Sequence, residues 1–362
     1  MPSEQKLSFV YQSQPSRVVF GEGSLAKTPE EIDRLGASRV LVIATPGRKK
    51  LADELAARLG SKSVGVFDRA VMHVPAETAQ EGRAEAARLN ADCYVAIGGG
   101  SATGLAKAIA LISGHPILCI PTTYAGSEMT STWGLTEGGI KKNARDPLVL
   151  PKTVLYDPAL TMSMSATLSA TSGMNAVAHC VEALYAQEAN PIVSLMAEEG
   201  IRAMARSLPV VVKEPASMEA RSLALYGAWL GGASLGAAGM ALHHKLCHIL
   251  GGAFNLPHAE THTVLLPHAT AYNAPAAPQA MERIARALQS KSAAQGLYAL
   301  EAGMDAPLSL ESIGMKREGL DHAADLAVKT PSYNPRPLER DAIRALLEDA
   351  FEGRPPRTWP SI

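Results

Sequence analysis

The chain changes its sequence pattern near residue 157, and no other feature constrains its fold as strongly. Before this point, short runs of β-branched residues alternate with stretches in which apolar residues recur at helical spacing, as at 51–60 and 77–90. We expect strands at 39–45, 63–68, 92–99 and 115–121. Strands that alternate with helices in this way predict βαβ units and a parallel sheet.

Beyond residue 158 the chain is rich in Ala, Leu and Met at helical spacing, with hardly any strand-like alternation. Asp157-Pro158 is a suitable boundary, because proline disfavours regular structure in the residue before it and aspartate often begins a turn or helix. A length of 362 residues also exceeds what one core usually supports. The sequence predicts a doubly wound α/β nucleotide-binding domain at 1–157 and an all-α domain at 158–362.

Charge and composition limit the partners of the chain. The 34 Lys and Arg residues balance 35 Asp and Glu residues, so there is no electrostatic reason to expect a nucleic acid or a membrane surface. The N-terminus lacks the features of a signal peptide and no long uncharged apolar segment follows, so we expect a cytoplasmic location. The four cysteines form no CxxC pair and are expected to be reduced core residues.

A glycine-rich turn, Gly98-Gly99-Gly100-Ser101, lies directly after a predicted strand and before a helical stretch that begins near Ala102. Glycine lets the backbone N–H groups approach a phosphate, and the helix N-terminus adds its positive dipole end. We predict that Gly99, Gly100 and Ser101 bind the pyrophosphate of a dinucleotide. The turn lacks the GxGxxG pattern, and a tight turn without a ligand is the alternative.

Hydroxyl side chains follow the next predicted strand, at Thr122, Thr123 and Ser127. The carboxyl ends of adjacent parallel strands are where ligands bind in open α/β sheets, so these residues are candidates for the nicotinamide ribose or amide. Thr45 ends the first strand, and the stretch at 44–50 holds three basic residues and no acid. Because no acid is present to select the ribose of NADH, we predict that NADPH serves about as well as NADH.

Histidines are concentrated in two segments of the helical half. His243, His244, His248, His258, His262 and His268 lie between residues 241 and 268, and His179 lies in an earlier helical stretch. His244 and His248 share a helix face, as do Asn175 and His179. A single histidine of this kind is most often a hydrogen-bonded core residue, but a cluster is costly to bury without a shared purpose.

Five motifs occur in the order GGGSxxxxAK, PTT, DPxL, SGMNAxxHxxEA and HHxxxHxxGGxxNxPH. In this order they resemble the iron-containing alcohol dehydrogenases over most of the chain. The resemblance implies a dehydroquinate synthase-like fold, with a Rossmann-like N-terminal domain, an all-α C-terminal domain and a cleft between them. In such enzymes an Asp and three His bind a divalent metal, and the matching positions here are Asn175, His179, His244 and His258.

Asn175 stands where the metal-binding members carry the aspartate, so the chain resembles the maleylacetate reductase branch, in which a metal is generally not required. Three neutral imidazoles and an amide should bind Fe²⁺ or Mg²⁺ weakly. Gly104, in place of a usual acid, and His243, beside His244, also match this branch. The resemblance therefore implies NADH or NADPH as the cofactor, no required metal, and a homodimer.

Members of this branch reduce the C=C bond of 2-maleylacetate to give 3-oxoadipate during aromatic compound degradation. Hydride transfer to the carbon β to the ketone leaves an enolate, whose oxygen needs a positive or hydrogen-bonding partner. Our hypothesis is that His243 and His244 stabilise this enolate or deliver the proton. His248, His258 and Asn175 would then orient the substrate.

The substrate would be a small dicarboxylate enone, whose two carboxylates need donors in the cleft. Candidates are Lys142, the Thr122–Ser127 loop and His73, although Lys142 is also typical of a solvated loop charge. The resemblance places His73 near the cofactor and Leu160 of the DPxL turn against the nicotinamide. A structural role for either residue is equally compatible with the sequence.

Two other functions remain open at this point. One is a metal-dependent alcohol or polyol dehydrogenase that tolerates Asn175 as a neutral ligand, which stoichiometric metal would indicate. The other is a catalytically silent nucleotide-binding protein, which would oxidise no NADH with any enone or carbonyl substrate.

Overall fold

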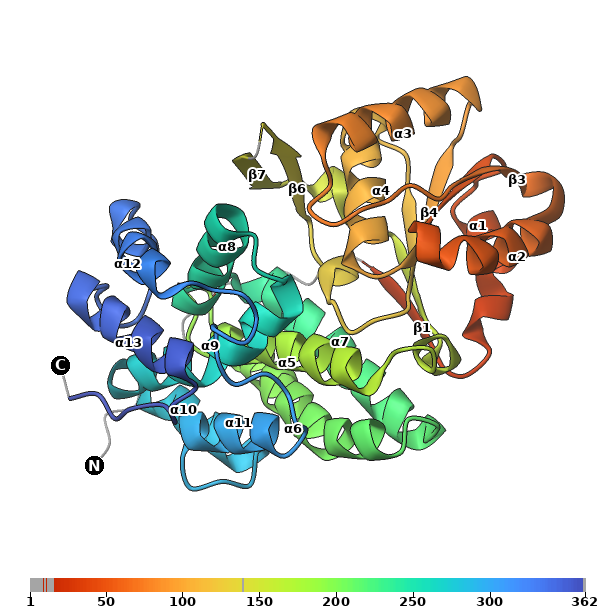
Figure 1. The fold of residues 1–362 in the computed structure, drawn as a ribbon. Helices are drawn as coiled ribbons and strands as arrows, with labels where there is room; N and C mark the ends of the chain where they lie inside the picture. Colours follow the sequence, from red (N-terminus) through yellow and green to blue (C-terminus); the bar gives the residue numbers. More distant parts are fainter. Residues whose placement is uncertain (1–8, 10, 12–15, 139, 361–362) are drawn as a thin grey trace.

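Six parallel strands form the core of the first half of the chain (Figure 1). Their order across the sheet is β1 (Arg17–Phe20), β8 (Thr153–Tyr156), β5 (Ile117–Pro121), β4 (Cys93–Gly98), β2 (Val40–Ile43) and β3 (Ser63–Phe67). The computed structural model describes residues 9, 11, 16–138 and 140–360. Most of the N-terminal segment in which we looked for a signal peptide therefore lies outside the described residues. All four strands predicted from β-branched runs are confirmed.

The central strands are buried on both faces, which explains their continuous apolar runs. Alternate residues of β2 and β4 point to opposite faces: Val42 and Ile97 join one hydrophobic cluster, and Leu41 and Ala96 join another. The helices that cover these faces are α1 (Thr28–Arg34), α2 (Lys49–Leu59), α3 (Ala76–Arg88) and α4 (Gly100–Ser113). The predicted doubly wound arrangement is therefore confirmed.

The strand order reverses between β2 and β4. The chain leaves β2 outward to β3, and it leaves β4 in the opposite direction to β5. The crevice at the carboxyl ends of two such strands is where open α/β sheets bind ligands. Thr45 follows β2 and Gly99 follows β4, so both lie at this switch point.

The second half of the chain is helical, drawn in green and blue in Figure 1. Its helices are α5 (Ala166–Ala183), α6 (Pro191–Lys213), α7 (Met218–Ala238), α8 (Leu242–Phe254), α9 (His258–Asn273), α10 (Pro278–Ala287), α11 (Ala293–Ala302), α12 (Leu320–Lys329) and α13 (Arg340–Glu352). Helix α5 packs against α6, α7 and α9 at the centre of this half. Residues 157–360 contain no strand, as the sequence predicted.

The last strand of the sheet ends one residue before Asp157, whose carboxylate caps the following turn by accepting from Ala159 N at 3.1 Å and from Leu25 N at 3.1 Å. A domain boundary at 157/158 stays a prediction. All four cysteines are buried and free, which confirms that they are reduced core residues. Of the helices that the structure describes, none combines the length and the apolar character needed to cross a lipid bilayer.

The sequence did not predict the antiparallel hairpin of β6 (Thr132–Glu137) and β7 (Ile140–Arg145). It stands beside α3 and α4 in Figure 1. A short parallel bridge between Pro75 and Thr136 ties it to the segment that precedes α3.

Candidate active site

A cavity of about 700 Å³ is lined by residues from both halves of the chain. Thr45, Gly99 and Thr122 contribute from the sheet half, and Asn175 and His244 contribute from the helical half. This volume is typical of small-molecule and cofactor sites.

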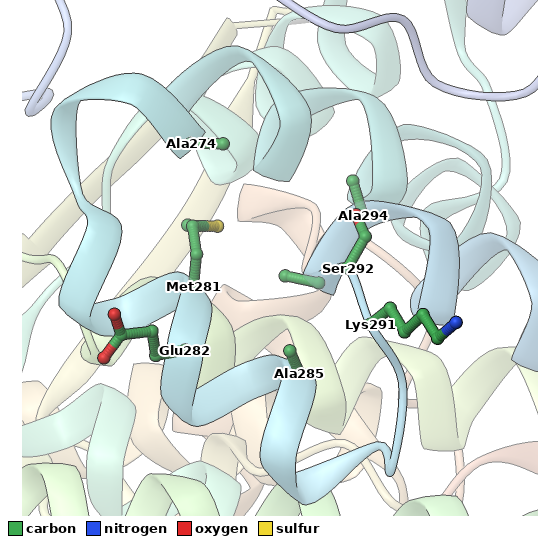
Figure 2. A pocket seen from close by; sticks show the side chains of 8 residues that line it. Ala274, Met281, Glu282, Ala285, Lys291, Ser292 and Ala294 are labelled. Atoms are coloured by element: carbon green, nitrogen blue, oxygen red, sulfur yellow. The ribbon is translucent and has the colours of Figure 1, made fainter.

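Figure 2 shows a second, smaller hollow of about 280 Å³, lined by residues of α10, α11 and the segments beside them. Its walls are mainly short side chains, and the charged ends of Glu282 and Lys291 point away from each other. No residue that the sequence singled out lines it, so the larger cavity is the candidate active site.

The glycine-rich turn forms one wall of the cavity. Gly98 has φ of +151°, a conformation that favours glycine, and α4 begins directly at Gly100. A Cβ on Gly99 would lie 2.9 Å from Thr123 Oγ1, so only glycine lets the two loops approach this closely. Gly99, Gly100 and Ser101 all line the cavity at a helix N-terminus, which is a ready anion site.

The hydroxyl loop after β5 forms the adjoining wall, with Thr122, Thr123 and Ser127 in the cavity lining. Lys107, which the sequence analysis did not single out, anchors this loop from α4. Its Nζ donates to Ser127 O at 2.7 Å, to Thr130 O at 2.7 Å and to Thr132 O at 2.8 Å. Burial lowers the pKa of Lys107 to about 8. Lys107 is the lysine of the GGGSxxxxAK motif, so that motif could have indicated its role in the site.

Glycine also allows the hydroxyl loop to pack directly on the helical half. Gly126 has φ of +77°, and a Cβ there would lie 2.9 Å from His179 Nδ1 and 3.1 Å from Gly232 Cα. The hydroxyl loop therefore packs directly against α5 and α7.

Thr45 and the half-buried Arg48 line the cavity at the carboxyl end of β2. Arg48 Nη1 donates to Ser163 Oγ at 2.7 Å. His73 lines the cavity from a turn in which its φ is +65°. Its backbone O accepts from Thr136 Oγ1 at 2.8 Å, which fixes the turn to the hairpin.

The polar residues of the helical half meet at the same cavity. Asn175 and His179 come from α5, His244 and His248 from α8, and His258 from the first turn of α9. The rings of His179 and His244 stack with centroids 5.2 Å apart. Burial, together with the charges of the neighbouring imidazoles, lowers the pKa of His179 well below its ordinary value, so this ring is neutral.

Glu182 holds His244 in place, and the sequence analysis did not identify it as a site residue. Its Oε2 lies 2.6 Å from His244 Nδ1, and its carboxylate accepts from Ala241 N at 2.9 Å and from His243 N at 2.7 Å. Because the carboxylate accepts the Nδ1 proton, the lone pair of the neutral His244 ring lies on Nε2. Glu182 could have been predicted from the sequence, because it is an acidic residue one turn after His179 in an otherwise apolar helix.

His243 does not line the cavity. It is fully buried, and its Nε2 lies 2.9 Å from Nδ1 of His262, another fully buried histidine. Adjacent residues on a helix point in directions about 100° apart, so His243 faces the core when His244 faces the cavity. The structure therefore gives no support to direct contact between His243 and the substrate. His262, not chosen as a site residue, lies at the centre of the cluster, with ring centroids 4.4 Å from His258 and 4.8 Å from His244.

Two further candidates are not brought to the cavity. Lys142 is exposed on β7 and pairs with Glu137 at 2.7 Å. Leu160 packs against the apolar cluster on one face of the sheet, which matches a core leucine in a domain-linking turn. Neither residue lines the cavity, because β7 turns Lys142 outward and the turn after β8 turns Leu160 inward.

The family models that match this chain are those of iron-containing alcohol dehydrogenase, over residues 15–158, and of the C-terminal domain of the Fe-containing alcohol dehydrogenase family, over residues 169–351. An iron-containing alcohol dehydrogenase from Corynebacterium glutamicum, known from its crystal structure, is 44% identical in sequence to this chain. The two structures align with a TM-score of 0.92 over 96% of this chain and 97% of that chain. These matches imply an iron cofactor, so the expectation that no metal is required is wrong.

The cluster fits a metal ion. Asn175 Oδ1 and His244 Nε2 are buried without a hydrogen-bond partner among the described residues, and both residues line the cavity with His179 and His258. Neutral imidazoles and an amide oxygen offer lone pairs of the kind that a divalent cation takes. Loss of the aspartate charge at Asn175 was taken to make iron binding weak, but the amide still offers this unpaired buried oxygen beside the imidazoles.

The chain is also similar over nearly its full length to maleylacetate reductases. It is 59% identical over 346 residues to the maleylacetate reductase of Burkholderia cepacia, which covers 96% of this chain and 98% of that protein. The crystal structure of the maleylacetate reductase from Agrobacterium tumefaciens is 51% identical, with a TM-score of 0.94 over 97% of this chain and 100% of that chain. The chain therefore belongs to the iron-containing alcohol dehydrogenase family and, within it, to the maleylacetate reductases.

Proposed function

We propose that this protein reduces the C=C bond of 2-maleylacetate with hydride from NADH or NADPH and releases 3-oxoadipate, a step in the degradation of aromatic compounds. The observation that carries the proposal is that one cavity joins the glycine-rich turn to the imidazole cluster. A cofactor on the turn and an enone beside the imidazoles would share this space.

The cofactor would bind at the edge of the sheet. Its pyrophosphate would accept from the N-terminus of α4 at Gly99, Gly100 and Ser101, where the dipole favours an anion. Thr122 and Thr123 offer hydroxyls to the nicotinamide end. Arg48 lies at the β2 edge, where it would pair with the 2′-phosphate of NADPH.

The reaction adds hydride to the carbon β to the ketone and leaves an enolate. Asn175, His179, His244 and His258 would hold the iron, and when bound it supplies a Lewis acid for the ketone oxygen. Glu182 fixes the orientation and tautomer of His244 from behind. A proton on the α carbon then completes the saturated product.

His248 is the residue that we assign to proton delivery. It lines the cavity and is half-buried, so its imidazole can exchange protons with water. Its ring centroid lies 6.3 Å from that of His244. His243, in contrast, is sealed in the core, where burial lowers its pKa well below the ordinary value.

A metal-dependent alcohol or polyol dehydrogenase is the weaker alternative, because the curated relatives that are about half identical to this chain are maleylacetate reductases. A homodimer and a cytoplasmic location stay predictions.

The deciding experiment uses purified protein whose iron content has been measured. The absorbance of NADH or NADPH is followed during incubation with maleylacetate, and the product is identified by mass spectrometry. Stoichiometric 3-oxoadipate supports the proposal. Oxidation of NADH with simple aldehydes, but not with maleylacetate, would instead indicate an alcohol dehydrogenase.

A further inference from the structure

Arg145, the last residue of β7, lines the same cavity. It lies opposite Thr132 in the hairpin register, at the base where the hairpin joins the sheet half. Within the described part of the chain, the side chain of Arg145 forms no hydrogen bond or ion pair. It is therefore an exposed cation at the cavity wall that takes part in no ion pair with any described residue.

The position of the guanidinium follows from its contact with Gly239. A Cβ on Gly239 would lie 3.4 Å from Arg145 Nη2 and 3.1 Å from Glu188 Oε2. Gly239 ends α7, and the chain then enters α8, which carries His244 and His248. The guanidinium thus lies beside the segment that leads into α8 and its two cavity imidazoles.

Strand geometry explains why Arg145 reaches the cavity when Lys142 does not. Successive side chains of a strand point to opposite faces, so residues 143 and 145 share one face and residue 142 lies on the other. Asn143 and Arg145 both line the cavity, while Lys142 pairs with Glu137 away from it.

We propose that Arg145 binds one carboxylate of the substrate, with Asn143 beside it. This inference rests on the proposed function, in which the substrate is a dicarboxylate. A carboxylate in a cavity is strongly disfavoured without a partner, and a guanidinium can donate two parallel hydrogen bonds to it. Among the described residues that line the cavity, Arg48 is the only other Lys or Arg, and it lies just after the carboxyl end of β2. Arg145 therefore selects enones that carry a carboxylate over neutral enones.

The test compares Arg145→Gln with the matched variant Lys142→Gln, which changes the same type of charge on the outer face of the same strand. With maleylacetate and saturating NADH, we expect the KM for maleylacetate to rise about 10- to 100-fold in R145Q, as for the loss of a hydrogen bond to a charged group. The KM for NADH should stay unchanged, Arg145→Lys should recover part of the affinity, and K142Q should match the wild type. An unchanged KM for maleylacetate in R145Q would overturn the inference, as would an equal rise in K142Q.

A binding measurement separates this inference from the proposed function. Titration calorimetry with adipate, a saturated dicarboxylate, on the NADH-loaded protein needs no turnover. If the wild type fails to reduce maleylacetate yet binds adipate more tightly than R145Q does, the proposed function fails and the carboxylate site stands. Equal adipate affinity of the wild type and R145Q rejects the site, and normal thermal melting of R145Q ensures that the variant is folded.

Discussion

The carboxylate of Glu182 lies 2.6 Å from Nδ1 of His244, and both side chains are almost fully buried. A carboxylate behind a histidine fixes the orientation of the ring and raises the basicity of the opposite nitrogen. Here that opposite nitrogen belongs to a residue that lines the cavity and has no hydrogen-bond partner among the described residues. Glu182 on α5 therefore fixes the orientation of a histidine that lines the cavity.

Glu182→Gln is expected to weaken the binding of Fe²⁺ about 10- to 100-fold, which is the usual effect of removing such a partner. The side chain keeps its volume, but its neutral amide no longer favours the Nδ1–H tautomer of His244. Iron bound per protein, measured after dialysis against graded chelator concentrations, gives the affinity. Glu188→Gln, which alters an exposed carboxylate, serves as the control, and equal iron retention in both variants would show that Glu182 does not support the ligand.

Patterns formed by residues a few positions apart in the sequence predicted most of the fold. The four strands of β-branched residues, the helix after Gly98–Gly100 and the spacing of His244 and His248 each depend on neighbours within a few positions of the chain. Such patterns determine which side chains share a face. The same information brought Asn175 and His179 to one side of α5.

Features that depend on packing between distant segments were not predicted. His243 and His244 were both assigned to the enolate, and the contact of His243 with His262 on α9 shows that His243 faces the core. The β6–β7 hairpin was not recognised, so Lys142 was considered and Arg145 was not. Glu182 was quoted only as part of a motif, because its three partners come from residues about 60 positions away.

His248→Ala is expected to lower kcat about a hundredfold, the scale for losing one general acid, with little change in the KM for NADH. His243→Ala should act differently, because it removes a buried hydrogen bond to His262 and leaves the cavity wall intact. We expect it to lower the melting temperature more than kcat. Steady-state kinetics and thermal melts of both variants check the pair, and a hundredfold loss of kcat in H243A alone would reverse the two roles.

Arg48→Ala is expected to raise the KM for NADPH about tenfold while the KM for NADH changes little, because only NADPH carries the extra phosphate. Arg48 lines the cavity, whereas Lys50 on the same segment is 93% exposed and does not. Lys50→Ala is therefore the matched control. Equal changes in the KM of both cofactors in R48A would mean that Arg48 does not contact the 2′-phosphate.

His268 makes part of the stability of the fold depend on pH. It is buried in α9, and burial lowers its pKa to about 4, against the opposing charge of Asp349. The folded state therefore favours the neutral ring, while the unfolded chain binds a proton near pH 6.5. The stabilisation is complete above pH 6.5 and is lost as the pH falls toward 4.

Replacement of His268 by Phe removes this titration, so the wild type should lose about 2 kcal/mol more than the variant between pH 7.5 and pH 4.5. Urea unfolding at both pH values gives the two differences, and subtracting them cancels the other buried histidines, which titrate alike in both proteins. Any fixed cost of fitting Phe into the site also cancels, because it is the same at each pH. Equal pH dependence of the two proteins would mean that His268 takes up its proton without unfolding, by reaching solvent or by pairing with Asp349.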